Sequence, residues 1–389
     1  MAESEFEDVL RMTPAGLYCG RGDFYVDPWG PVERAVITHA HSDHARRGSR
    51  HYVAHADSEP ILRTRLGADI SLTPLPYGEA ITVNGVRVSL HPAGHIRGSA
   101  QVRIESEGRV AVVTGDYKRG DDPTTASFEP LRCDLLVTES TFGLPVFRWP
   151  LAEEVYAEIN GWWAANREAG KTSILYAYAV GKSQRVLAAL DPSIGPIYCH
   201  GAVMVGNEAY EQSGASFPKY ERISEVERRG GRKVAWHEGI VLAPPSAHGT
   251  PWMRRFGATS TAMASGWMAI RGTRRRKAMD RGFVLSDHVD WAELLQTVHD
   301  CSPAEVWVTH GFAAIVARYL SETGLARAMP LKTHFVGETV EGGEAASEDE
   351  PSGGTESGGE GQGNASDIPQ NASDIPQQED AQEIGEGGS

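Results

Sequence analysis

The segment Val36-Ile-Thr-His-Ala-His-Ser-Asp-His44 limits what this chain can be more than any other feature. An apolar, strand-like run leads directly into a His-x-His-x-Asp-His pattern. Residues i and i+2 of an extended segment point to the same side, so His39 and His41 can bind one metal ion. Asp43 and His44 follow and can face a second ion. Imidazole and carboxylate ligands suit zinc, and also manganese or iron. The pattern therefore predicts two divalent metal ions, with an ordinary polar turn as the alternative.

Other side chains of the same type also follow strand-like runs. Runs at 86–91, 110–114, 135–138, 282–285 and 306–309 lead to His95, Asp116, Glu139, His288 and His310, respectively. Each residue taken alone is more typical of a cap or of a hydrogen-bonded polar group. Together they predict a single cleft at one edge of the sheets, because a rigid scaffold positions functional loops.

These residues suggest roles in a hydrolytic reaction. Asp116 is the natural bridging ligand, because one carboxylate can bind two cations. Two such ions can activate a water molecule and stabilise the oxygens of an in-line displacement. The leaving oxygen needs a proton, and His288, oriented by Glu139, is the candidate acid. Asp27, in the segment Phe-Tyr-Val-Asp-Pro, either orients the His39 loop or simply forms a turn.

The rest of the ordered chain alternates strand-like and helical patterns. Helices are expected at 152–165, 183–190, 291–298 and 313–320, with a strand at 173–178. Such alternation predicts an α/β fold. Gly181-Lys-Ser183 superficially matches a phosphate-binding loop, but position 176 is Tyr where that motif requires Gly, so nucleotide binding is excluded there.

The acidity of the chain belongs to its last residues. The formal net charge is −15, but 14 acidic and no basic residues lie from Glu338 onward, which leaves 37 basic against 38 acidic residues before it. The segment 338–389 has little to bury and repeats Asn-Ala-Ser-Asp-Ile-Pro-Gln in tandem at 364–377. It is predicted to be a disordered acidic tail, with an interaction role as the alternative. The acidity therefore does not exclude a nucleic-acid substrate.

The N-terminus and the cysteines indicate the setting of the protein. The first eight residues lack the apolar run of a signal peptide, and no segment approaches the ~20 apolar residues that span a bilayer. These features predict a cytoplasmic protein with no membrane contact. Four widely spaced cysteines form no Cys-x-x-Cys pair and are expected to be buried thiols: Cys19, Cys133, Cys199 and Cys301.

A basic stretch precedes His288. Between residues 219 and 281 there are 14 basic against 5 acidic residues. This stretch predicts a nucleic-acid contact, with a solvated face as the alternative. Its densest part gives the predicted nucleic-acid-binding residues Arg271, Arg274, Arg275, Arg276 and Lys277. Trp236, Trp252 and Trp267 lie among the basic residues and either stack on bases or pack in a core.

The motifs resemble the metallo-β-lactamase superfamily and, within it, the β-CASP nucleases. The segments that carry the resemblance to β-CASP are Thr138-Glu-Ser-Thr-Phe-Gly143, Ala177-Tyr-Ala-Val-Gly-Lys-Ser-Gln184, Leu285-Ser-Asp-His288 and Thr309-His310-Gly311. Leu17-Tyr-Cys-Gly-Arg-Gly-Asp-Phe-Tyr-Val-Asp-Pro28 and Ser265-Gly-Trp-Met-Ala-Ile-Arg-Gly272 look like bacterial ligase-associated exonucleases. The resemblance covers roughly residues 15–337.

The resemblance implies a fold and a set of roles. The fold is an αββα sandwich over 1–147 and 281–337, an inserted α/β β-CASP domain over 148–280, and the tail 338–389. It assigns His39, His41, His95 and Asp116 to one metal, and Asp43, His44, Asp116 and His310 to the other. It makes His288, Glu139 and Asp43 the catalytic residues, and it alone selects His310 as a ligand and His288 as the acid.

The resemblance also implies an activity. It predicts a nuclease that uses two zinc or manganese ions to hydrolyse DNA from an end, in repair, with an ATP-dependent DNA ligase and a helicase as partners. His310 departs from eukaryotic DNA-cutting members, which commonly have Val there, and favours an RNA-processing nuclease as the alternative. A small-molecule metallohydrolase and a catalytically silent nucleic-acid-binding scaffold are further alternatives, against which the basic stretch and the complete ligand set argue, respectively.

Overall fold

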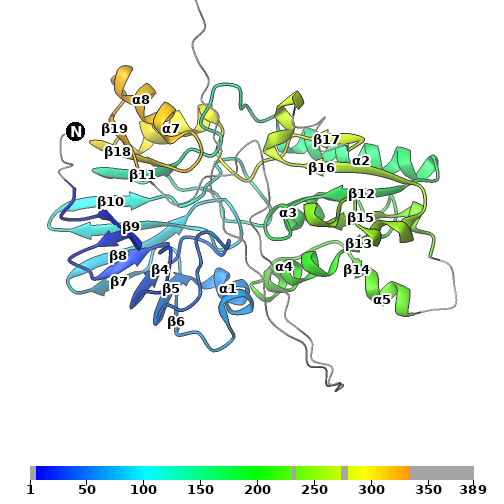
Figure 1. Ribbon diagram of the computed structural model, residues 1–389, viewed down its shortest axis with the longest axis horizontal. Helices are drawn as coiled ribbons and strands as arrows, with labels where there is room; N and C mark the ends of the chain where they lie inside the picture. Colours follow the sequence, from blue (N-terminus) through cyan, green and yellow to red (C-terminus); the bar gives the residue numbers. More distant parts are fainter. Residues whose placement is uncertain (1–5, 230–233, 273–278, 333–389) are drawn as a thin grey trace, which may run out of the picture. The chain divides into compact units, whose positions relative to one another are not determined.

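Three sheets carry the fold in the part of the chain that the computed structural model describes, residues 6–229, 234–272 and 279–332 (Figure 1). The first sheet has the order β1 (Arg11–Thr13), β2 (Gly16–Cys19), β3 (Phe24–Val26), β4 (Arg34–Val36), β5 (His51–His55), β6 (Leu72–Leu75). The second has the order β19 (Arg327–Pro330), β18 (Glu305–Thr309), β11 (Leu135–Glu139), β10 (Arg109–Val113), β9 (Ala100–Ser106), β8 (Val86–Pro92), β7 (Ala80–Val83).

These two sheets pack face to face with helices outside. Val36 and Val53 of the first sheet share one core with Val102 and Val137 of the second. Helix α1 (Glu59–Leu66) covers the outer face of the first sheet, and helices α7 (Trp291–Cys301) and α8 (Ala313–Glu322) cover the outer face of the second. The layers therefore follow the expected αββα order.

The third sheet is wholly parallel, with the order β14 (Tyr220–Arg222), β13 (Ile197–Cys199), β15 (Ile240–Ala243), β12 (Thr172–Tyr176), β16 (Thr259–Ala264), β17 (Arg281–Phe283). Strand β12 is buried throughout, as expected for a parallel strand covered on both faces. Helices α2 (Ala152–Glu168), α3 (Lys182–Ala189) and α4 (Gly201–Gln212) pack on one face. On the other face lie α5 (Ile223–Arg228) and short 3₁₀ turns.

The α/β sandwich with an inserted α/β domain is confirmed. Each helix and strand expected from the sequence is present, within a few residues at its ends. The predicted boundary after residue 280 falls just before β17, which pairs with β16, so the chain leaves the third sheet only after Phe283. The predicted disordered tail, 338–389, lies outside the described residues.

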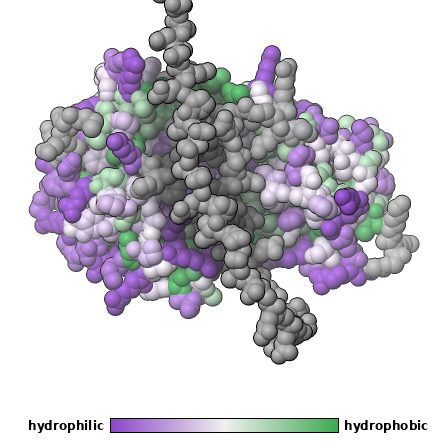
Figure 2. Space-filling view, viewed as in Figure 1, coloured by the Kyte–Doolittle hydropathy of each residue, from purple (hydrophilic) through white to green (hydrophobic). Residues whose placement is uncertain are grey.

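The large apolar side chains lie mainly inside. Hydrophilic residues dominate the described surface on the face shown in Figure 2, and apolar residues form only small patches there. No described helix has both the length and the hydropathy needed to cross a membrane. All four cysteines are buried thiols, as predicted.

Candidate metal centre

Strands that run in the same direction bring the predicted ligands to one edge. Strands β10, β11 and β18 are parallel, and β8 is antiparallel to β9, which is antiparallel to β10, so β8 shares their direction. The residues at or just beyond their carboxyl ends are His95, Asp116, Glu139 and His310. The His39 loop of the first sheet joins this edge, where the Ala100 amide donates to the Thr38 carbonyl at 2.7 Å.

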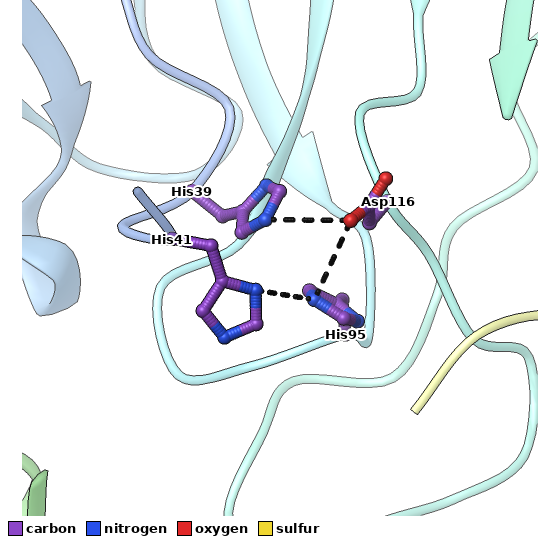
Figure 3. Close-up of side chains that lie close together, drawn as sticks. All are labelled: His39, His41, His95 and Asp116. Atoms are coloured by element: carbon purple, nitrogen blue, oxygen red, sulfur yellow. Dashed lines mark hydrogen bonds and ion pairs between the residues drawn. The ribbon is translucent and has the colours of Figure 1, made fainter. Parts of the chain in front are cut away.

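The first cluster consists of His39, His41, His95 and Asp116, each with a ligand atom within 4.8 Å of the others (Figure 3). Asp116 Oδ2 lies 3.6 Å from His39 Nε2 and 3.8 Å from His95 Nε2. These distances are too long for hydrogen bonds. Four ligand-type groups thus surround one point, and Asp116 makes no hydrogen bond to His39 or His95 there.

The hydrogen bonds on the outer side of this cluster fix where its imidazoles carry their protons. His41 Nε2 lies 3.1 Å from the Val180 carbonyl, and His95 Nδ1 lies 2.8 Å from the Asp287 carbonyl. A carbonyl can only accept, so both of these nitrogens are protonated. The inner nitrogens, His41 Nδ1 and His95 Nε2, then carry lone pairs that face each other at 3.1 Å. A divalent cation between them would turn this repulsion into coordination, so the residues fit a metal.

Asp27 orients two further histidines. It accepts from the Thr38 amide at 2.8 Å and from the Thr38 hydroxyl at 2.5 Å, and its Oδ2 lies 2.7 Å from His44 Nδ1. Because that hydroxyl donates to Asp27, it accepts from His39 Nδ1, 3.1 Å away. The Nε2 atoms of His39 and His44 are buried and have no hydrogen-bond partner among the described residues. Asp27 holds a left-handed φ of 46°, a conformation that is rare for a non-glycine residue. The geometry favours the orienting role over a simple turn.

The second cluster consists of Asp43, His44 and His310, again with ligand atoms within 4.8 Å of one another. His44 Nε2 lies 3.7 Å from Asp43 Oδ2 and 3.6 Å from Asp116 Oδ2. The His310 ring stacks on that of His44 with 5.3 Å between centroids. Asp116 therefore borders both clusters, as the bridging role requires.

The electrostatics of the centre suit a cation. Burial lowers the pKa of His41 and of His310 to about 4, so both are neutral ligands at pH 7. Burial raises the pKa of Asp116 to about 7. Burial opposes the charged form of His44, but Asp116, Asp43 and Asp27 together raise its pKa to about 10. The carboxylates around His44 thus stabilise positive charge at this point.

His288 and Glu139 form a pair beside the clusters. His288 Nδ1 lies 2.9 Å from Glu139 Oε2, and Glu139 Oε1 accepts from the Tyr117 amide at 2.8 Å. Burial would raise the pKa of Glu139, but His288, together with hydrogen bonds from the Thr141 side chain and the Tyr117 amide, more than offsets it, so this pKa lies below its ordinary value. Asp116, Glu139 and His288 also lie within 4.8 Å of one another. Position alone is therefore compatible with His288 as an acid or as a ligand.

The predicted nucleic-acid-binding stretch is only partly described. Arg271 is exposed. Arg274, Arg275, Arg276 and Lys277 lie outside the described residues. Among the tryptophans that precede them, Trp236 and Trp267 are buried in an apolar core, and Trp252 packs against that core. Core packing accounts for all three.

Several contacts at the centre were not predicted from the sequence. They include the carbonyls of Val180 and Asp287, and the buried side chains of Lys182, Arg185 and Asp287. Both carbonyls lie in segments that carry the resemblance to β-CASP nucleases, 177–184 and 285–288. A backbone carbonyl has no side-chain signature, so the motifs indicated these segments but could not predict the hydrogen bonds of their carbonyls.

Comparisons with known proteins give relatives of two kinds. No family model matches the sequence. A protein named Probable DNA ligase from Opitutus terrae is 33% identical over 313 residues, 80% of this chain and 30% of that protein. A protein named RNase aCSPSF2 from Saccharolobus solfataricus is 26% identical over 257 residues, 55% of this chain and 51% of that protein.

A solved structure shares the fold. The crystal structure of a protein of unknown function from Enterococcus faecalis V583 superposes with a TM-score of 0.53 at 11% identity, over 78% of this chain and 80% of that one. At this identity, the likeness shows the fold alone. The chain spans 30% of the length of the Opitutus relative and 51% of the Saccharolobus relative.

Proposed function

The chain belongs to the β-CASP group of the metallo-β-lactamase superfamily, and on that premise we propose that it is a metal-dependent nuclease that hydrolyses the phosphodiester bonds of DNA. One observation carries the proposal. Asp116 stands between two histidine clusters, and a histidine–glutamate pair lies beside it. Nε2 of His39 and of His44 has no hydrogen-bond partner among the described residues, and the inner nitrogens of His41 and His95 face each other. A centre of this kind suits the hydrolysis of an anionic ester.

The two clusters would hold two divalent ions. His39, His41 and His95 would bind one, Asp43, His44 and His310 the other, and Asp116 both. Such ions supply Lewis acidity and an activated water at neutral pH. The nitrogen-rich ligand set favours zinc, with manganese as the other candidate. The contribution of the chain is to fix the ligands: Asp27 orients His44, and the carbonyls of Val180 and Asp287 orient His41 and His95.

His288 would donate the proton that the leaving oxygen needs. Its Nδ1–H is directed to Glu139, so Nε2 is the nitrogen that would hold and release the proton. The anionic form of Glu139 stabilises the imidazolium form of His288 beside it. A positioned acid of this kind typically contributes about 100- to 10,000-fold in rate.

DNA is the proposed substrate because a relative that matches 80% of this chain is named a DNA ligase. A nuclease domain within such a protein would process the ends that a ligase joins. We therefore place the activity at DNA ends, in repair, with a ligase as a partner. The helicase partner rests on the family resemblance alone.

RNA is the second candidate. The Saccharolobus relative is named an RNase, and the family resemblance links His310 in the last motif of this chain to RNA-processing members. The two substrates share the phosphodiester chemistry and differ at the 2′-hydroxyl. The proposed metal centre would act on the phosphodiester of either polymer. Discrimination between DNA and RNA would therefore depend on the surface that binds the polymer.

The experiment incubates the purified chain with end-labelled single- and double-stranded DNA and matching RNA, in Zn²⁺ or Mn²⁺. We expect cleavage of DNA from an end. His288→Ala should lower the rate about 100- to 10,000-fold while zinc content stays at wild type, whereas Asp43→Ala should lose both activity and one zinc. His299→Ala, on the exposed side of α7, is the matched control.

Three outcomes would count against the proposal. Cleavage of RNA but not DNA would replace the substrate with the second candidate. Loss of zinc from His288→Ala would make that residue a ligand and not the acid. Full activity in Asp43→Ala would rule out a mechanism that needs both ions.

A further inference from the structure

Two ligands of the first cluster are oriented by segments of the third sheet. Val180 lies between β12 and α3, and Asp287 lies four residues beyond β17. Their carbonyls accept from His41 Nε2 and His95 Nδ1. The outer contacts of the second cluster lie elsewhere: His44 binds Asp27, and His310 Nδ1 lies 3.0 Å from the Thr309 hydroxyl.

One buried carboxylate joins the two carbonyl-bearing segments. Asp287 Oδ2 accepts from Lys182 Nζ at 2.6 Å, and its Oδ1 accepts from Arg185 Nη1 at 3.0 Å. Lys182 follows Val180 by two residues. Arg185 Nη1 also donates to the Ser286 carbonyl at 2.6 Å. The ion pairs therefore hold the first turn of α3, just after Val180, against the segment after β17.

The network continues into the loop after β10. Asp122 Oδ2 accepts from Lys118 Nζ at 2.8 Å and lies 3.3 Å from Arg185 Nε. Asp122 Oδ1 accepts from the amide and the hydroxyl of Thr124 at 2.8 and 2.7 Å. Lys118 follows Asp116 by two residues, so the network also reaches the chain beside the bridging ligand.

The burial of these charges indicates what the network can contribute to the protein. All five charged side chains of the network are at most 6% exposed. Buried ion pairs seldom stabilise a fold more than apolar residues of the same volume would, because desolvation offsets their attraction. Their directional hydrogen bonds do fix geometry. A network with little net stability to offer, placed behind two metal ligands, is best explained by the geometry that it fixes.

We propose that the inserted sheet completes the first metal cluster, with Lys182, Arg185 and Asp287 as positioning residues that hold the carbonyls of Val180 and Asp287 against His41 and His95. The inference rests on the metal centre of the proposed function. Zinc affinity at the first cluster depends on this network, and zinc affinity at the second cluster does not.

The experiment measures zinc affinity one cluster at a time, in the full chain, by competition with a chelator. His310→Ala leaves the first cluster as the intact one, and His95→Ala leaves the second. Lys182→Met, added to each background, removes one ion pair of Asp287 and keeps the other. We expect zinc affinity to fall about 10- to 100-fold in the His310→Ala background, the range typical for residues behind metal ligands, and to stay unchanged in the His95→Ala background.

Two further variants separate positioning from general loosening. Lys182→Arg keeps the charge and should restore most of the affinity. Arg255→Met removes another ion pair of the inserted domain, to Glu227 at 2.7 Å, which involves neither carbonyl. We expect Arg255→Met to leave zinc affinity at both clusters unchanged.

The outcomes distinguish the two proposals. A wild-type chain that binds no zinc would overturn the metal centre itself. A wild-type chain that binds two zinc ions, while Lys182→Met weakens both clusters equally or neither, would overturn the positioning role alone. If Lys182→Met shows no cooperative unfolding transition, Arg185→Lys replaces it in both backgrounds and the same outcomes decide.

Discussion

The two halves of the metal centre differ in what builds them. The first cluster takes its ligands from the loops after β4, β8 and β10, but its outer hydrogen bonds come from segments that flank the third sheet. The second cluster takes both its ligands and its outer contacts from the two-sheet sandwich. The contacts described for the second cluster therefore lie within the sandwich, whereas those of the first extend to the segments that flank the third sheet.

The two halves also differ in access. In the first cluster, the side chains of His39, His95 and Asp116 are at most 8% exposed, and His41 is half-buried. In the second, Asp43 is 45% exposed and His310 is half-buried, whereas His44 is only 5% exposed. Asp43 is therefore the side chain of the two clusters that a substrate would reach most easily.

Removing the residue that the halves share should have the largest effect. Asp116→Asn keeps the shape of the side chain but loses the charge that both clusters use. We expect zinc to be lost from both, and nuclease activity to fall on the order of 1,000-fold or more, equivalent to about 4 kcal/mol of transition-state stabilisation. Zinc content by mass spectrometry and cleavage rate on labelled DNA measure the two effects.

Asp121→Asn is the control for that change. It lies in the same loop, is exposed, and accepts only from the Ser127 hydroxyl among the contacts described for it. Retention of one tightly bound zinc by Asp116→Asn would mean that the clusters do not share this ligand. The two clusters would then bind zinc independently of each other.

A smaller, one-sided effect should follow from Asp27→Asn. Its oxygen lies 2.7 Å from His44 Nδ1 in the second cluster, but it reaches His39 in the first only through the Thr38 hydroxyl. We expect about 10- to 100-fold weaker zinc binding where only the second cluster is intact, in a His95→Ala background, and a lesser loss in a His310→Ala background. Chelator competition measures both.

Asp23→Asn, in the same turn region, serves as the comparison. Asp23 also has a left-handed φ, 53°, but its carboxylate pairs with Tyr18 and Arg34, away from the centre. Zinc affinity should stay at wild type in this variant. Equal losses at both clusters in Asp27→Asn would mean that the two halves share their support as well as Asp116.

The sequence predicts the proposed ligands of both clusters more readily than the contacts that orient them. Apolar runs that end in His or Asp predict strands and place their last residues at one sheet edge, which brings the candidate ligands together, whereas the choice of His310 as a ligand rests on the family resemblance. Asp43 and His44 are adjacent in one motif, so their meeting is a local matter. The contact of His41 with Val180 joins residues 139 positions apart, and no local pattern encodes such a pairing.

The inserted sheet illustrates the same limit. Its strands read as short apolar runs, but their order, with β12 between β15 and β16, depends on contacts across the whole insertion. Asp287 and Lys182 look like surface residues by type, and only the packing of α3 against the segment after β17 buries them together. The candidate ligands could be predicted from side-chain type. The charged residues behind them, such as Asp287 and Lys182, could be recognised only from their burial in the structure.

The smallest effect on either cluster should come from the basic stretch before His288. Replacing Arg274, Arg275 and Arg276 together by Ala removes three positive charges, so DNA binding should weaken. The slope of log affinity against log salt should become less steep by about 0.9 for each DNA phosphate that the variant no longer neutralises. Filter binding between about 50 and 200 mM salt measures this. Zinc content should stay at wild type, because the positioning of both clusters is accounted for by other residues.

A control that removes the same charge from exposed sites of the sandwich, Arg318, Arg327 and Lys332, should leave the slope unchanged. Unchanged DNA binding in the triple Ala variant would mean that the basic stretch is only a solvated face. Loss of zinc would mean that the stretch also supports one or both metal clusters.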